Sequence, residues 1–193
     1  MKILIVNAGS SSLKYQLVDM DNENVIAKGG VERIGLEGAN LKQKDAEGNV
    51  NAKFEQPIEN HVVACDLMIK ALLNSKVIES MDEIGAVGHR VLHGGEEFTA
   101  SCIITEEVKA AIRKYIPLGP LHNPANLMGI EACEKVMPTT PQVAVFDTAF
   151  HQTMPRRPSC TACPMSSIRR WACAVTASTA PLTATCPSAF ASS

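Results

Sequence analysis

The sequence has no long apolar segment. Only four aliphatic residues, Ile3 to Val6, follow the N-terminal Met1-Lys2, and such a run is too short for a signal peptide or a membrane span. Basic residues are not in excess either, because 18 Lys and Arg face 20 Asp and Glu for a formal net charge of −2. We therefore expect a cytoplasmic protein with reduced cysteines that binds neither membrane nor nucleic acid.

The last part of the chain lacks acidic residues and lysine. Residues 156–193 carry only four charges, all arginine, so residues 1–155 have a formal net charge of −6. Ala, Ser, Thr, Pro and Cys dominate this tail, and it has little apolar surface to offset the entropy of ordering. We expect residues 1–155 to form one α/β domain and residues 156–193 to lack stable packing.

Residues 1–155 alternate between strand and helix patterns. Apolar runs bounded by turn residues predict strands, with room for short exposed strands in a polar stretch; they cover residues 2–8, 13–20, 24–34, 84–92 and 142–146, and the polar stretch is 36–57. Helical spacing and capping residues predict helices over 60–74, from Thr105 to the prolines at 117 and 120, and over 123–136. Gly29-Gly30 indicates a bulge or tight bend. This order is typical of an α/β domain with a mixed sheet.

The first group that could carry chemistry is Asn7-Ala-Gly-Ser-Ser-Ser-Leu-Lys14. A strand leads into a Gly/Ser turn whose backbone N–H groups and hydroxyls suit phosphate oxygens, with the Lys14 ammonium beside them. Asn7 offers an amide oxygen for a magnesium ion. The ending of a P-loop is missing, and so is a dinucleotide fingerprint. A plain hairpin turn explains the same residues about equally well.

The second group surrounds Arg90, within Gly88-His-Arg-Val-Leu-His-Gly-Gly95. An arginine at a strand end can bind a carboxylate through two charge-assisted hydrogen bonds, and the glycines let a ligand approach the backbone. His89 and His93 have the spacing of helical metal ligands, but the segment is predicted to be a strand. We expect structural roles for both histidines and no zinc site.

Two further groups follow. In Pro120-Leu-His122-Asn123-Pro, His122 could donate to a developing negative charge, although the segment also fits a helix entry in which Asn123 is the cap. Asp147 follows the strand 142–146, at the edge where open α/β sheets place ligand groups. It could order magnesium or the attacking group in phosphoryl transfer, or be an ordinary exposed strand-end aspartate.

Together, the four motifs closely resemble the acetate kinase (acetokinase) family. The matching strings are NAGSSSLKY, GHRVLHGGE, PLGPLHNPANL and VFDTAFHQTMP, in the family's order and spacing within residues 1–155. The resemblance implies the N-terminal domain of the acetate and sugar kinase/Hsp70/actin superfamily, a ribonuclease H-like fold with a mixed sheet. It also implies ATP-dependent phosphorylation of acetate to acetyl phosphate, with Mg²⁺, by a homodimer.

The resemblance further assigns roles to nine residues. Asn7 would help to bind magnesium, while Lys14, Ser10 and Ser12 would contact the nucleotide phosphates. Arg90 would hold the acetate carboxylate, and Leu92 and Leu121 would form the wall around its methyl group. His122 and Asp147 would be the catalytic residues.

The sequence departs from the family after Pro155. The resemblance implies a Gly-Phe-His-Gly-Thr-Ser-His-Arg-Tyr motif and a second domain with further catalytic groups, so we expect this chain to be a truncated form with doubtful activity. One permitted coding of Thr176–Thr185, read from its third base, gives that motif. The tail is therefore interpreted as a frameshifted reading, which the nucleotide sequence would test.

Three other interpretations stay open. The acid could be propionate or butyrate, because pocket size depends partly on residues outside this chain. The domain could be a non-catalytic nucleotide-binding module of the actin type, although such a module has no evident use for Arg90. The chain could also be a remnant without function.

Overall fold

The computed structural model describes residues 1–151, so the expected lack of packing in residues 156–193 lies outside the described part. The strands are β1 (Lys2–Ala8), β2 (Ser12–Asp19), β3 (Asn24–Glu32), β4 (Asn40–Asp45), β5 (Val50–Glu55), β6 (Ile84–Val91), β7 (Cys102–Ile103) and β8 (Gln142–Phe146). The helices are α1 (His61–Asn74), α2 (Glu106–Lys114) and α3 (Asn123–Val136), with short 3-10 turns at Met81–Glu83, Ile116–Leu118 and Asp147–His151. None of these helices is long and apolar enough to cross a membrane.

All eight strands form one mixed sheet in the order β5-β4-β3-β2-β1-β6-β8-β7. The central strand β1 pairs antiparallel with β2 and parallel with β6, and β6 pairs parallel with β8. The carboxyl ends of β1, β6 and β8 therefore meet at one edge of the sheet, where ligands bind in open α/β folds. This topology brings Asn7, Arg90 and Asp147 to the same edge.

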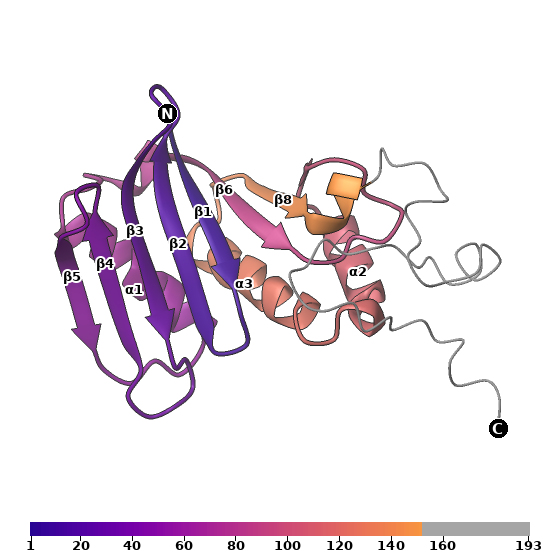
Figure 1. The fold of residues 1–193 in the computed structure, drawn as a ribbon, viewed down its shortest axis with the longest axis horizontal. Coiled ribbons are helices and arrows are strands. Elements are labelled where there is room, and N and C mark those ends of the chain that lie inside the picture. The colour runs from indigo at the N-terminus through magenta and orange to yellow at the C-terminus, as the bar shows by residue number, and fades with distance from the viewer. Residues whose placement is uncertain (152–193) are drawn as a thin grey trace.

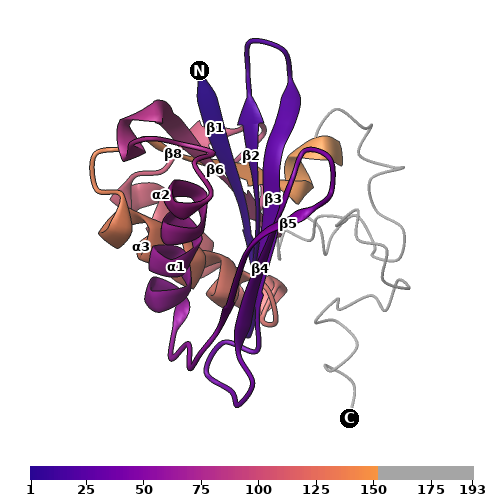
Figure 2. The ribbon, with the colours of Figure 1, turned by 90° about the vertical axis from the view of Figure 1, so that its left-hand side faces the viewer.

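The core lies between the sheet and the helices, which all cover one face (Figures 1 and 2). Alternate residues of β1 and β2, such as Leu4 and Leu17, point to that face and are fully buried with Met68 and Leu72 of α1. No described helix covers the other face of the sheet, which we call the open face. It carries the alternate, outward residues of the same strands.

Most helix boundaries agree with the sequence. The side chain of Asn60 accepts a hydrogen bond from Val63 N–H and so caps α1, while Thr105 accepts from Val108 N–H and caps α2 as predicted. Helix α2 ends at Lys114, before the prolines. The strand pattern predicted β1 and β8 with their observed bounds.

Gly29-Gly30 is not a bulge, contrary to the sequence prediction. Both residues pair regularly with β2 and β4, and the irregularity between β2 and β3 lies at Leu17/Val18. Glycine is needed at 29 because a Cβ there would lie 2.5 Å from the Tyr15 ring. The Tyr15 hydroxyl donates to Gln43 Oε1 (2.8 Å) across the buried face.

The segment 36–57 does hold two strands, β4 and β5. However, β4 is exposed on only one of its two faces. On the other face, Leu41 and Gln43 are completely buried against the helices. The sequence did not indicate this buried face, because residue 43 is polar and interrupts the alternation of apolar residues. The two-residue strand β7 was not predicted, because Cys102–Ile103 is too short to show periodicity.

Candidate functional site

The Gly/Ser turn is a tight hairpin at the carboxyl end of β1. Gly9 N–H donates to the Ser12 carbonyl oxygen (2.7 Å), and Ile34 N–H donates to that of Ser11 (2.9 Å). His61, the first residue of α1, places Nε2 2.7 Å from the Gly9 carbonyl oxygen, so this nitrogen carries a proton and donates. The turn is thus fixed from two sides. Sequence reasoning gave His61 no role, because nothing in the helix pattern connects it with residue 9.

Asn7, Lys14 and Arg90 lie together on the open face. Asn7 and Lys14 are direct partners in the β1–β2 ladder, and Arg90 is on β6, the other neighbour of β1. The three side chains line one concavity of about 640 Å³. The structure therefore brings the residue predicted to bind metal, the one predicted to bind phosphate and the one predicted to bind carboxylate onto one surface. Ser10 is exposed and Ser12 half-buried in the adjoining turn.

Arg90 and Asp147 form a two-pronged ion pair. Arg90 Nε lies 3.1 Å from each carboxylate oxygen of Asp147, and Nη2 lies 2.7 Å from Oδ2. The arginine side chain is 51% exposed and the aspartate 18%. Hydrogen bonding to Asp147 raises the pKa of Arg90 above its ordinary value, against a smaller opposing effect of burial. Asp147 thus occupies only the Nε/Nη2 edge of the guanidinium, and the Nη1 side has no hydrogen bond within residues 1–151.

Helix α3 fixes the strand ends that carry these groups. Asn126 donates from Nδ2 to the Ala8 carbonyl oxygen (3.0 Å) and accepts at Oδ1 from Leu92 N–H (3.2 Å). Asn123 accepts at Oδ1 from His93 N–H and donates from Nδ2 to the His93 carbonyl oxygen. Gly129 permits this approach, since a Cβ there would lie 2.4 Å from the Ala8 Cβ. Both asparagines are buried, and sequence reasoning missed this bridging role.

Three predicted site residues lie apart from any interaction that would define their roles. His122 is exposed and is itself the N-cap of α3, without a capping hydrogen bond from its side chain. The alternative in which Asn123 caps the helix is therefore wrong, because that side chain turns inward to His93. Leu121 is 80% exposed, while Leu92 is half-buried. Their proposed contact with a substrate methyl group stays a prediction.

His89 and His93 are buried in separate polar contacts. His89 Nε2 lies 2.6 Å from Gln142 Oε1, whereas His93 Nδ1 accepts from Gly95 N–H (3.0 Å) and its ring stacks on Tyr115. Burial lowers the pKa of His89 to about 4, although its hydrogen bond to Gln142 opposes the shift. Burial also lowers the pKa of His93. Both rings are therefore neutral near pH 7.

The buried His89 predicts a loss of stability in mild acid. Its pKa is about 4 in the folded chain and about 6.5 in an unfolded one, so unfolding takes up a proton between these values. The stability that His89 contributes is complete above pH 6.5 and falls by roughly 3 kcal/mol as the pH drops to 4. Urea unfolding from pH 7 to 4 should show a shallower decline for His89→Gln than for wild type. Parallel curves for the two proteins would contradict this prediction.

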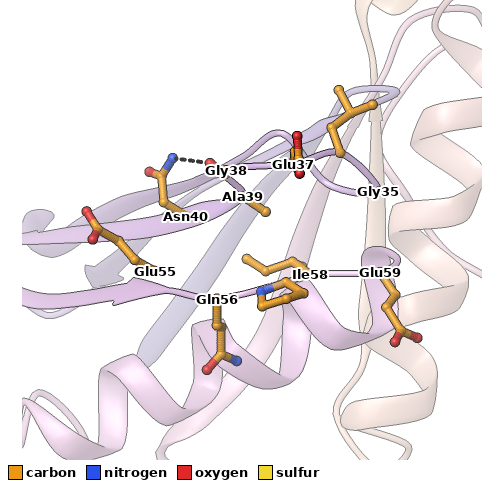
Figure 3. Close-up of a pocket in the computed structure, with 11 residues that line it drawn as sticks. Gly35, Glu37, Gly38, Ala39, Asn40, Glu55, Gln56, Ile58 and Glu59 are labelled. Carbon is orange, nitrogen blue, oxygen red and sulfur yellow. Dashed lines mark hydrogen bonds between the residues drawn. The ribbon is translucent and has the colours of Figure 1, made fainter.

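A second, larger concavity is not the predicted site. It has a volume of about 790 Å³ and lies between the β3–β4 connection and the segment after β5 (Figure 3). Glu37, Glu55 and Glu59 line it, and these carboxylates would repel a phosphate or carboxylate ligand. None of the nine predicted site residues lines it. The anion-binding groups gather instead on the open face.

The donor set fits a magnesium ion that arrives with phosphate. Residues 1–151 contain no cluster of three or more His, Cys, Asp and Glu placed to hold a metal. Magnesium usually keeps several waters and binds through one or two protein oxygens together with substrate phosphates. The half-buried Asn7 amide, which faces Lys14 across the ladder, suits such a shared ion.

Solved structures of two kinases share the fold of this chain. The chain is similar to the crystal structure of Porphyromonas gingivalis acetate kinase, with a TM-score of 0.81 and 45% identity over 88% of this chain and 43% of that one. A propionate kinase from Francisella tularensis gives a TM-score of 0.76 at 34% identity, over 88% of this chain and 42% of that one. The fold is therefore that of the N-terminal domain of the acetate and sugar kinase/Hsp70/actin class, as predicted.

The family follows from the sequence match. Residues 2–173 match the Acetokinase family, and the chain belongs to that family. The acetate kinase of Desulfitobacterium hafniense is 60% identical over 157 residues, which are 80% of this chain and 39% of the relative. The acetate kinase of Alkaliphilus metalliredigens is 57% identical over the same shares. The chain thus spans about two fifths of the length of these relatives.

Proposed function

We propose that this chain supplies one wall of an acetate kinase active site, in which ATP phosphorylates acetate to acetyl phosphate. The observation that carries the proposal is the position of Arg90. Asp147 holds one edge of its guanidinium, which leaves the other edge for a carboxylate, and Lys14 lies on the same face. A carboxylate clamp beside a phosphate-binding turn suits phosphoryl transfer to a carboxyl group.

The nucleotide side of this site would use the Gly/Ser turn. Ser10 and Ser12 would donate hydroxyl hydrogen bonds to phosphate oxygens, and the Lys14 ammonium would neutralise their charge. Asn7 would coordinate the magnesium ion that ATP carries, and that ion would supply further charge neutralisation. Because the turn is fixed by His61 and by the β3 end, these groups would not have to reorganise on binding.

The acceptor side would use Arg90 and the residues around it. Arg90 would bind acetate and, after transfer, the charge on acetyl phosphate. Leu92 and Leu121 would contact its methyl group, and His122 would donate to the transferring phosphoryl group. Asp147 would hold the Arg90 side chain in position. Its negative charge would also influence how charge is distributed in the transition state.

Propionate is the second candidate acid. The Francisella propionate kinase matches the same 88% of this chain as the Porphyromonas acetate kinase, with a TM-score of 0.76 against 0.81, so the fold alone does not choose between the two acids. An actin-type module without catalysis is less well supported, because it gives no use to the edge of Arg90 that has no hydrogen bond within residues 1–151. We also propose that the enzyme acts in the cytoplasm, where ATP is available. Its dimer partner would be a second copy of the chain. The domain boundary at 155 and the frameshifted tail also remain proposals.

A fusion tests the function directly. Residues 1–151 of this chain would replace the matching part of the Desulfitobacterium acetate kinase, and acyl phosphate would be trapped with hydroxylamine. We expect activity with acetate, and a kcat/KM for butyrate lower by roughly 10- to 200-fold per extra methylene. The unmodified relative is the control. A folded fusion without activity on any of the acids would refute the proposal, and preference for propionate would favour the second candidate.

A further inference from the structure

Four lysines line the part of the open face over β2, β3 and β4. Lys14, Lys28, Lys42 and Lys44 are all exposed and line the same concavity of about 640 Å³ as Arg90. We call Lys28, Lys42 and Lys44 the lysine strip. In the sheet register, Lys42 and Lys14 flank Gly30, and Lys28 lies directly opposite Lys44. The strip therefore continues from Lys14 on β2, away from the Gly/Ser turn, across β3 and β4.

The arrangement of the strip is unfavourable for the fold itself. Lys28 faces Lys44, and Lys42 faces Lys53 on β5, and like charges directly opposite one another destabilise a sheet. Elsewhere most lysines contact a carboxylate, as in Lys70 with Asp66. Within residues 1–151 no lysine of the strip forms an ion pair.

The residues that follow the described domain in this sequence supply no side-chain carboxylate. Residues 152–193 contain no Asp or Glu, and their charged side chains are all arginine. Among the residues that line the concavity, Glu32 is the one carboxylate, and it is one row away, opposite Ser12 and Asn40. Within residues 1–151 the three strip lysines thus have no carboxylate in contact with them, which points to an external anion.

The floor of the strip suits a small, highly charged anion. Gly30 has no side chain, so the lysines stand around a bare stretch of β3. Among residues 1–151 the aromatic residue that lines the concavity is Tyr15, which is 1% exposed, so this part of the chain offers no ring to stack on a nucleic-acid base. Lysine ammonium groups act as point charges and attract phosphate without fixing its orientation.

We propose that Lys28, Lys42 and Lys44 form a binding site for a short inorganic phosphate chain, such as pyrophosphate or tripolyphosphate, separate from the Gly/Ser turn. Several linked phosphates place multiple negative charges along one ligand, as the three lysines place positive charges along β3 and β4. Affinity should increase with the number of phosphates, from orthophosphate to tripolyphosphate. An adenosine group should add nothing at this site.

Calorimetric titration of the full 193-residue chain with tripolyphosphate at low salt tests the site. The variant K28Q/K42Q/K44Q should bind at least about tenfold more weakly, since each exposed charge pair is worth up to about a factor of five. The variant K70Q/K76Q/K135Q removes the same charge from the helix side and should change affinity less than about twofold. Circular dichroism would confirm that both variants fold.

Three outcomes would overturn the proposal. In the first, the wild-type chain does not bind tripolyphosphate, which would show that the site does not exist. Equal weakening in the two triple variants would show a response to net charge alone. ATP titrations separate the strip from the nucleotide turn: if the strip variant loses ATP affinity as strongly as tripolyphosphate affinity, the strip belongs to the nucleotide site and no separate site exists.

Discussion

Arg90→Ala is expected to raise the KM for acetate about 100-fold in the fusion described above. The substitution removes the guanidinium edge proposed to hold the carboxylate, and two charge-assisted hydrogen bonds at about 1.5 kcal/mol each give about that factor. Arg90→Lys should recover only part of the affinity, because an ammonium keeps the charge but not the planar fork. Steady-state kinetics with acetate varied at saturating ATP would measure both effects.

Arg113→Ala is the matched control for Arg90. Arg113 has nearly the same exposure, 48%, and also contacts a carboxylate, Glu131 at 2.6 Å, but it lies on α2. Its replacement should leave the KM for acetate within twofold of wild type. An unchanged acetate KM in Arg90→Ala would remove the basis for assigning a carboxylate substrate.

Asp147→Asn is expected to lower kcat roughly 100-fold, with a much smaller change in KM. Asparagine keeps the size of the side chain and one oxygen for Arg90 Nε, but it loses the negative charge. An acid that acts mainly in the transition state affects turnover more than ground-state binding. Initial rates over a range of acetate and ATP concentrations would separate the two parameters.

The ion pair allows a competing outcome. If Asp147 only holds Arg90 in place, then Asp147→Asn should raise the acetate KM and leave kcat nearly unchanged. The double variant with Arg90→Ala would then be no worse than Arg90→Ala alone. Glu131→Gln, which removes the carboxylate from the Arg113 pair, serves as the control and should alter neither parameter.

Local sequence predicted the elements of this domain well, because their signals are local. Four consecutive aliphatic residues defined β1, apolar residues at helical spacing defined α1, and Thr105 marked the start of α2 through its cap. Gly29 was misinterpreted because the reason for it is the Tyr15 ring on the neighbouring strand. A glycine that makes room for a side chain on another strand has the same local pattern as one that permits a bend.

The site was predicted as a set of residue types but not as a set of contacts. Strand-end positions indicated Arg90 and Asp147 separately, and their ion pair joins residues 57 positions apart. Asn126 looked like an ordinary helix residue, although it bridges β1 and β6. Pairings over such separations depend on the order of strands in the sheet, which periodicity does not reveal.

The bridge made by Asn126 also has a consequence for the order of events during synthesis. Its bond to the Ala8 carbonyl oxygen closes a loop of 118 residues, and contacts of such long range form late because the entropy of closing the loop is paid first. The β1–β2 hairpin can form on the ribosome early, since its strands are adjacent in the chain. Its carboxyl end is fixed against β6 only after α3 has been translated and docked. The nascent hairpin would therefore carry Ser10 and Lys14 for much of translation without Arg90 held beside them.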